Sequence, residues 1–225
     1  MAESMMLGAM LIGGGICKNA LCVTSSHFCS AEKQYRYPLD YGGQRSPTTQ
    51  WTVTGSGAAL LSNTDGIAYI KSVTTGKIID MGINDANNMG AAMAPAACDT
   101  ILSLFRETNT KPDDYDLILT GDLGVIGSDL LCDMLNKQGY DIYKNHNDCG
   151  KMIFDIKNQD VHSGGSGCGC CGSVFCGHII NRLKKKEIKR MLLVATGALM
   201  TPMAIFQGET IPSIAHALVI TSERE

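Results

Sequence analysis

Short apolar strands alternate with helix-like segments along the sequence, and this alternation restricts the fold more than any other feature. Helical patterns are expected at 5–12, 95–107, 128–137 and from 168 onward. Apolar segments typical of strands lie at 20–24, 51–61, 66–73, 115–120, 191–195 and 215–220. We place Ser128 as the N-cap and Gly139 as the C-cap of the 128–137 helix. Strands that alternate with helices predict an α/β protein with a largely parallel sheet.

A faint internal repeat bears on the domain organisation. A helix, a basic or glycine stop and an apolar strand occur at 5–26 and again at 171–197, each followed by a second strand, at 57–62 and 215–220. The chain has 225 residues, which is about one and a half domains at roughly 150 residues per domain. We therefore expect two copies of one half, with the first incomplete: residues 1–62 as the remainder of the first half and 63–225 as the second.

Charge and cysteine content exclude several functional classes. The net charge of -3 gives no general positive field for nucleic acid. Ten cysteines in 225 residues are too few for a disulfide scaffold, so we expect reduced thiols and a cytosolic setting. The amino-terminal apolar segment lacks the positive charge of a signal peptide, since Lys18 is the first basic residue. No apolar run approaches the roughly 18 residues of a membrane span.

Several longer segments resemble those of the stage V sporulation protein AD family, and together they cover essentially the whole chain. The segments are AEKQYRYPLDYGGQ, TVTGSGAALLS, DMGINDANNMGAAMAPAACDTI, PDDYDLILTGDLG, HNDCG, GGSGC and LLVATGAL. The resemblance implies a thiolase-like layered αβαβα fold of two duplicated halves. It also implies a role in moving dipicolinic acid, pyridine-2,6-dicarboxylate, through a membrane channel complex of the spore.

The same resemblance bears on catalysis. Thiolase-like condensing enzymes use a nucleophilic cysteine, and the aligned position lies before Met1, so we expect an amino-terminally truncated chain. The resemblance places His146, with Asn147 beside it, at the first carbonyl-polarising position, whereas the second falls in 164–168, which offers no amide or imidazole side chain. We expect a protein that is not an enzyme. The alternative is an acyltransferase of the thiolase or ketoacyl-synthase type whose nucleophilic cysteine lies upstream.

A glycine-rich turn that opens a helix could bind a carboxylate of the ligand. The turn directs backbone N–H groups and the positive end of a helix dipole toward an anion. Its candidate ligand-binding residues are Gly165, Ser166, Gly167 and Cys168. The alternative is that these glycines only let the helix pack tightly on the sheet.

The segment 33–45 combines cations with aromatic rings, both of which suit an aromatic dicarboxylate. We expect Arg36 or Arg45 to bind a carboxylate, and Tyr37, or Tyr35 or Tyr41, to line the ring site. The alternative is a solvated or dimer-contact loop.

The cysteines at 168–176 include one C-x-x-C pair without a second pair, so we predict no metal and assign these residues to close packing of helix on sheet.

The basic run 182–190 indicates a solvated helix end, or alternatively a contact with anionic lipid or a channel subunit. We expect no cofactor. The expected partners are dipicolinic acid with or without calcium, other channel subunits and a second copy of the chain. The expected location is peripheral, at the cytoplasmic face of the spore inner membrane.

Overall fold

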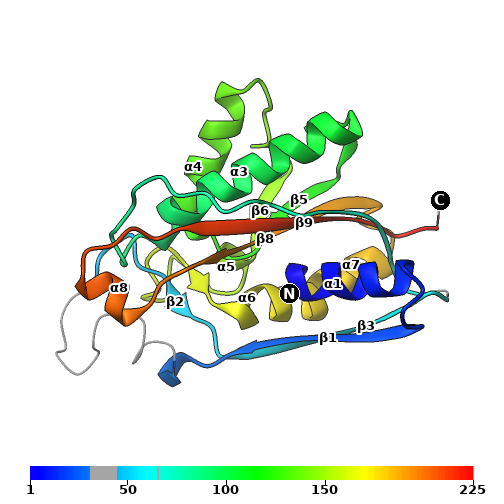
Figure 1. Ribbon diagram of the computed structural model, residues 1–225, viewed down its shortest axis with the longest axis horizontal. Coiled ribbons are helices and arrows are strands. Elements are labelled where there is room, and N and C mark those ends of the chain that lie inside the picture. The colour runs from blue at the N-terminus through cyan, green and yellow to red at the C-terminus, as the bar shows by residue number, and fades with distance from the viewer. Residues whose placement is uncertain (31–44, 65, 225) are drawn as a thin grey trace.

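The chain folds into four successive layers of helices and sheet in the computed structural model, which describes residues 1–30, 45–64 and 66–224 (Figure 1). Helices α3 (Met89–Thr108) and α4 (Gly124–Lys137) form one outer layer on a five-stranded sheet. Below that sheet lie α1 (Ala2–Gly13), α6 (Cys168–Val174) and α7 (Ile180–Lys184). The strand pair β1 (Asn19–Ser26) and β3 (Gly55–Ser62) forms the fourth layer. This αβαβ order agrees with the expected layered α/β fold.

The five-stranded sheet is mixed, so the prediction of a largely parallel sheet is wrong. Its order is β4-β9-β8-β5-β6, and only β8–β5 and β5–β6 pair in parallel. Strand β9 runs antiparallel to both of its neighbours, β4 and β8. A parallel return would need a crossover helix, whereas the connection from β8 to β9 holds only the five-residue α8 (Pro202–Phe206). The strand bounds are β4 (Tyr69–Thr74), β5 (Leu117–Thr120), β6 (His146–Asp148), β8 (Arg190–Ala198) and β9 (Ser213–Thr221).

The two outer helices begin earlier than their sequence patterns indicate. Helix α3 starts at Met89, with the side chain of Asn88 accepting the Ala91 N–H, so Pro95 lies inside the helix and not at its first turn. Helix α4 starts at Gly124, and Ser128 is a buried interior residue in place of the expected N-cap. The C-cap of α4 is Gln138, one residue before the predicted Gly139, which follows it with a φ of 87° and donates its N–H to the Asn136 carbonyl.

The two outer helices cross at glycines, where a Cβ on Gly90 would lie 2.7 Å from the backbone nitrogen of Gly127. A core of apolar side chains fills the space between these helices and the sheet, including Ile101, Leu104, Leu131 and Leu192. A second core, on the other face of the sheet, joins it to α1 and α6.

The expected single strand at 51–61 is two strands that join different partners. Strand β2 (Trp51–Thr52) pairs in parallel with β7 (Gly165–Ser166), while β3 pairs antiparallel with β1. Val53 lies between them: its N–H bonds to the Ser166 carbonyl, and its own carbonyl accepts the Ser26 hydroxyl. The residues after Trp51 thus connect the glycine-rich turn to the β1–β3 pair.

Helix α6 lies with its backbone directly on β3. The peptide of Gly172 is in close contact with Gly57, and that of Gly169 with Gly55, so that neither glycine pair has room for a Cβ. The helix continues through a π-helical turn, η3 (Phe175–Ile179), into α7. The assignment of the cysteines to close packing is supported by Cys170 and Cys171, which are buried in the core below the sheet.

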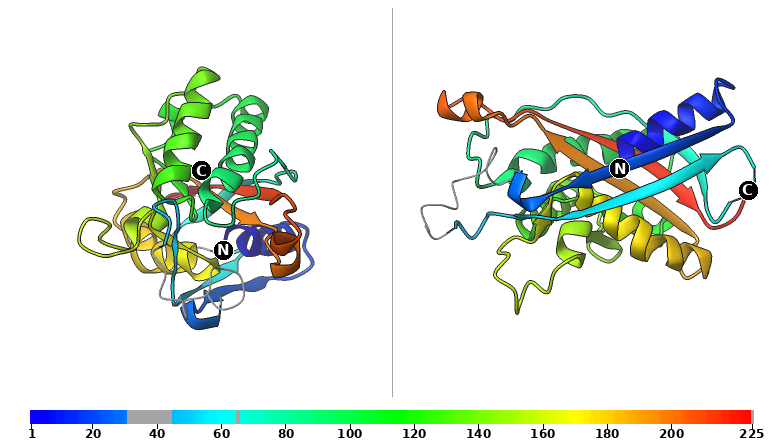
Figure 2. Two further views of the ribbon diagram at one scale, coloured as in Figure 1. Left: turned by 90° about the vertical axis from the view of Figure 1, so that its left-hand side faces the viewer. Right: turned by 90° about the horizontal axis from the view of Figure 1, so that it is seen from below.

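Two similar units appear in the chain, as the internal repeat predicts. Helix α1 leads to β1, which pairs antiparallel with β3; the α6–α7 segment leads to β8, which pairs antiparallel with β9. Both helical segments lie between the two sheets (Figure 2). The division into residues 1–62 and 63–225 stays a prediction.

Two short elements complete the fold, η2 (Pro112–Asp114) and α5 (Cys149–Met152).

The contact between α6 and β3 gives a testable prediction. Gly169→Ala places a methyl group against the Gly55 carbonyl and lowers the free energy of unfolding by about 1–3 kcal/mol. The matched control is Gly177→Ala, eight positions along the same helical segment, where a Cβ meets no atom within 4 Å. This control is neutral or gains up to about 1 kcal/mol. Urea unfolding measures both; equal stabilities would contradict the backbone contact.

Candidate functional site

A polar cluster lies at the carboxyl ends of the parallel strands, the edge where α/β sheets commonly bind ligands. Asp122 follows β5 by two residues and connects three segments of the chain. One oxygen of its carboxylate accepts the Gly167 N–H at 2.9 Å, and the other accepts the hydroxyl of Thr196, on β8, at 3.2 Å. The carboxylate thus holds the glycine-rich turn against the end of the central strand.

Two backbone N–H groups at the turn and the start of α6 are engaged by side chains of the protein itself. Besides Gly167, which bonds to Asp122, Gly169 donates its N–H to the Ser26 hydroxyl at 2.8 Å. Gly165 and Ser166 form β7, and Cys168 is exposed at the first position of α6. With these N–H groups occupied, and α6 only seven residues long, the close-packing alternative for the glycines has direct support. The carboxylate-binding role of residues 165–168 stays a prediction.

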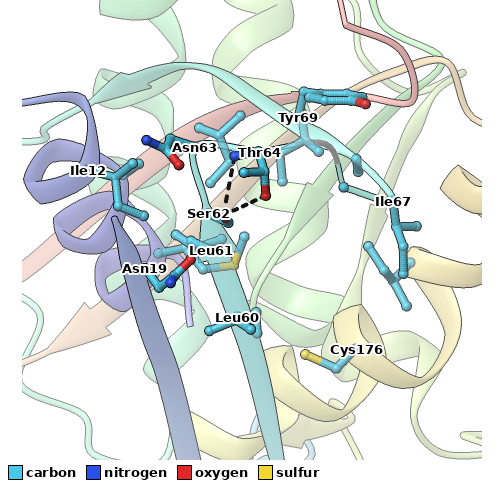
Figure 3. A pocket seen from close by; sticks show the side chains of 18 of the residues that line it. Ile12, Asn19, Leu60, Leu61, Ser62, Asn63, Thr64, Ile67, Tyr69 and Cys176 are labelled. Carbon is cyan, nitrogen blue, oxygen red and sulfur yellow. Dashed lines mark hydrogen bonds between the residues drawn. The ribbon is translucent and has the colours of Figure 1, made fainter. Parts of the chain in front are cut away.

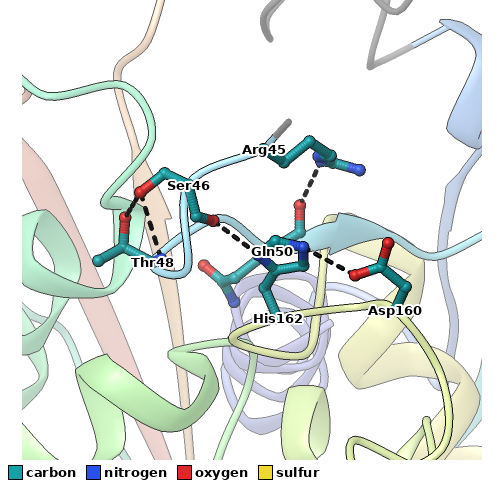
Figure 4. Close-up of polar contacts among 6 residues, drawn as sticks. All are labelled: Arg45, Ser46, Thr48, Gln50, Asp160 and His162. Carbon is teal, nitrogen blue, oxygen red and sulfur yellow. Dashed lines mark hydrogen bonds and ion pairs between the residues drawn. The ribbon is translucent and has the colours of Figure 1, made fainter. Parts of the chain in front are cut away.

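The structure brings Arg45 to this turn through Gln50. The side-chain nitrogen of Gln50 donates to the carbonyls of Asp122, at 2.7 Å, and Gly165, at 2.9 Å. Arg45 donates from Nη2 to the Gln50 carbonyl at 2.9 Å, as Figure 4 shows. Its guanidinium lies 4.6 Å from the centroid of the Trp51 ring, which stacks on Phe28 at 4.5 Å. A cation and a flat aromatic surface therefore adjoin the glycine-rich turn.

His162 fixes the loop that carries Arg45. Its Nδ1 lies 2.9 Å from the Ser46 carbonyl, and its Nε2 pairs with Asp160 at 2.8 Å (Figure 4). Both ring nitrogens therefore have partners within the protein, and the role of His162 in this structure is to hold the loop. Of the other residues expected in the ring site, Arg36, Tyr35, Tyr37 and Tyr41 lie outside the described residues.

His146 and Asn147 lie on β6, and their side chains make local contacts. His146 Nε2 is 3.0 Å from the Thr120 hydroxyl, and its Nδ1 is 3.5 Å from the Cys132 sulfur, on α4. Asn147 accepts the Asp148 N–H with its side-chain oxygen. Burial lowers the pKa of His146 to about 4 and raises the pKa of Cys132 to about 11. The imidazole and thiol are therefore both neutral at pH 7, and the contact is not a thiolate–imidazolium pair.

Asp148, which the sequence analysis did not single out, is the most connected side chain at this edge of the sheet. It is fully buried and accepts hydrogen bonds from the Thr120 hydroxyl and from the backbone N–H groups of Leu123, Gly124 and Gly150, all at 2.7–2.9 Å. Burial raises its pKa to about 6. An aspartate two residues before a glycine at the start of a helix is a recognisable N-cap signal, and Asp148 caps α5 in this way.

A cavity of about 910 Å³ lies apart from this cluster, beside the outer edge of β3 (Figure 3). Apolar side chains from α1, β3, β4, η3 and the connection from β3 to β4 line it, among them Ile12, Leu61, Ile67 and Tyr69. None of the described residues expected to bind the ligand belongs to its lining. The predicted site and this cavity are therefore separate places in the fold.

Metal ligation and membrane crossing both need arrangements of residues that the described parts of the chain do not offer. In residues 1–30, 45–64 and 66–224, no group of three or more His, Cys, Asp or Glu side chains is placed to hold a metal ion. None of the helices in these parts of the chain has the length and apolar character that a membrane crossing requires.

Comparison with known proteins identifies close and distant relatives. Residues 1–221 match the family model described as stage V sporulation protein AD. The stage V sporulation protein AD of Bacillus subtilis (strain 168) is 49% identical over 217 residues, which are 96% of this chain and 64% of that protein. The chain therefore spans less than two thirds of the length of this curated relative.

Two solved structures share the architecture at low sequence identity. The tetronic acid condensing enzyme AbyA1 matches with a TM-score of 0.56 and 16% identity over 98% of this chain and 64% of its own. The 3-oxoacyl-[acyl-carrier-protein] synthase III from Aquifex aeolicus VF5 matches with a TM-score of 0.55 and 11% identity, over 97% of this chain and 63% of its own. At such identities the likeness shows the fold alone, which is thiolase-like.

The neutral state of His146 gives a pH prediction. Its folded pKa of about 4 lies below the ordinary value of 6.5, so the unfolded chain takes up the proton first as pH falls. The stability from this site is complete above pH 6.5 and is lost as pH falls toward 4, by roughly 2–3 kcal/mol. Urea unfolding at pH 7 and pH 4.5 should show that His146→Gln removes this part of the acid sensitivity. The control His27→Gln, at an exposed histidine, should not. Parallel losses in wild type and His146→Gln would contradict the assignment.

Proposed function

Because this chain belongs to the stage V sporulation protein AD family, we propose that it binds dipicolinic acid as a non-catalytic, thiolase-like subunit in sporulation. In this proposal the ligand passes to a membrane channel complex for uptake into the developing spore. The protein acts peripherally, at the cytoplasmic face of the spore inner membrane. Calcium carried with the ligand, the channel subunits and a second copy of the chain are the partners of the proposal.

The observation that carries the ligand assignment is the position of Arg45 beside the glycine-rich turn. Dipicolinic acid is a flat aromatic ring with two carboxylates, so its binding needs positive charge and an apolar surface. Arg45 supplies the planar cation, and the Trp51–Phe28 stack supplies the flat surface. The hydrogen bonds from Arg45 to Gln50, and from Gln50 to Gly165, fix both relative to the turn.

Asp122 bears on where the ligand can lie. Its carboxylate already occupies the Gly167 N–H group, and a second anion at the same point would meet its negative charge. We therefore place the ligand carboxylates on the Arg45 side of the turn. Arg36 and Tyr37, from the neighbouring segment, remain part of the proposed site.

The non-catalytic part of the proposal rests on the state of the thiols. Catalysis by a condensing enzyme needs a thiolate or a cysteine with an adjacent base. Burial raises the pKa of Cys98, Cys132, Cys149, Cys170 and Cys176. The imidazole of His146 faces Thr120 and Cys132, two neighbours that hold it on the α4 side of the sheet. An acyltransferase that uses His146 would need to break these contacts.

Ligand binding can be tested by titration calorimetry with dipicolinate, using isophthalate as the matched ligand without the ring nitrogen. Arg45→Met should weaken dipicolinate binding about 10–100-fold, since a hydrogen bond to a charged group contributes about 1.5–3 kcal/mol. Arg45→Lys keeps the positive charge but loses the planar guanidinium, so its affinity for dipicolinate should lie between those of wild type and Arg45→Met. The control Arg106→Met, at an exposed arginine at the end of α3, should bind as wild type does. No heat with wild-type protein would contradict the ligand; equal affinity of Arg45→Met would contradict the site.

Thiol reactivity tests the state of the thiol beside His146 separately. At pH 7.5 a thiol with a pKa of about 11 is almost fully protonated, so iodoacetamide should modify buried Cys132 far more slowly than exposed Cys168. Peptide mass spectrometry of the native protein measures both rates. Modification of Cys132 as fast as Cys168 would contradict the protonated state of Cys132 and remove this support for the proposal.

A further inference from the structure

Five large apolar side chains are exposed at one end of the five-stranded sheet, on the connection from β4 to α3 and on the connection from β8 to β9, which includes α8. We call them the α8 patch: Ile78, Met81, Leu199, Met203 and Phe206. Each is between 65% and 88% exposed, with Phe206 the most exposed. Helix α8 projects from the end of the sheet at the left of Figure 1 and again in the right-hand view of Figure 2. Exposed apolar residues in a group, unlike single ones, mark interaction sites.

The two loops that carry the α8 patch are bound together. Ile79 and Ser213 exchange two backbone hydrogen bonds of 2.8 Å, and the Ile211 N–H donates to the Ile83 carbonyl at 2.7 Å. The Thr210 hydroxyl donates to the Asp80 carboxylate at 2.6 Å. Helix α8 itself is capped by the Thr201 side chain, which accepts the Ala204 N–H. The patch is therefore presented by a hydrogen-bonded platform.

The charges on the platform are negative. Asp80, Asp85 and Glu209 lie on the two loops, all exposed, whereas 78–88 and 199–212 contain no lysine or arginine. Lys77, just before this segment, pairs with Asp99 at 3.0 Å. The bonds from Thr210 and Gly82 hold the pKa of Asp80 below its usual range, so this carboxylate is ionised at pH 7. An apolar surface with an acidic rim results.

We propose that the α8 patch binds a segment of another protein that presents large apolar side chains flanked by lysines or arginines. The apolar side chains of that segment cover Met203 and Phe206, and its cations face Asp80, Asp85 and Glu209. The charge disfavours the two other occupants. An anionic lipid surface attracts basic patches and repels an acidic rim. Two copies joined patch to patch would bring equal negative charges together.

The test uses three synthetic helical peptides with one leucine face and a second face of lysine, glutamate or serine. We expect the lysine peptide to bind the native chain, the glutamate peptide at least tenfold more weakly, and 0.5 M salt to weaken the lysine peptide. The double variant Met203→Ser/Phe206→Ser should lose at least tenfold in affinity. The matched control is Leu21→Ser/Leu60→Ser, which removes side chains 67% and 70% exposed on the β1–β3 pair and should leave binding unchanged.

Three results would overturn the proposal. These are equal binding of the lysine and glutamate peptides, equal binding by the patch and control variants, or no peptide binding with the native fold retained in circular dichroism. Sedimentation with vesicles of phosphatidylcholine and phosphatidylglycerol that the patch variant abolishes would assign the patch to lipid instead. A dimer in analytical ultracentrifugation that only the patch variant dissociates would assign it to a second copy. Dipicolinate titration is unaffected by either double variant, so the two proposals fail independently.

Discussion

The contact of helix α6 with strand β3 is made by backbone on backbone, and the remaining layers are arranged around it. Because Gly169 and Gly172 lie against Gly55 and Gly57, the helix axis comes closer to the sheet than side chains would allow. The opposite face of the helix then reaches the five-stranded sheet with small thiols, Cys170 and Cys171, in the core. Gly172 and Cys171 thus serve one purpose, which is to fit a helix between two sheets.

That close fit also determines the chemistry at the start of α6. The Gly167 and Gly169 amides are directed toward Asp122 and Ser26, and these side chains satisfy them. A helix start of this kind is an anion site only where a polar partner from the protein does not fill it first. In the proposed site, the positive charge therefore comes from Arg45, on a loop that β2 and Gln50 attach to the turn. The site is an arrangement of three segments and not a property of the glycine motif alone.

The sequence was sufficient for the layered fold and for most elements, but not for features that depend on distant partners. The helix at Ala2–Gly13 and the strand at Asn19–Ser26 followed from local apolar patterns. The division of 51–61 into two strands did not, since it depends on Val53 bonding to Ser166, more than a hundred residues away. The start of α3 before Pro95 was not predicted, because proline favours the first turn of a helix, and the tertiary packing of Gly90 outweighed this local preference. At the site, residue types alone point to Arg45 and the glycine turn, and Asp148 carries a local N-cap signal, whereas Gln50 and Asp122 bond to backbone groups of distant segments that no spacing reveals.

The sequence separation of these contacts has a consequence for synthesis of the chain. Ser26 bonds to Gly169 and Thr24 to Cys168, so the β1–β3 pair, which packs on α1 and is complete at Ser62, lacks α6 until more than 100 further residues have been translated. Translation at roughly 5–20 residues per second leaves that apolar strand pair without its partner for several seconds on the ribosome. Contacts of long range also form late in folding. The glycines that permit the tight fit thus join β1 and β3 to a helix that is translated much later, and until then one part of this strand pair is open to aggregation and to chaperones.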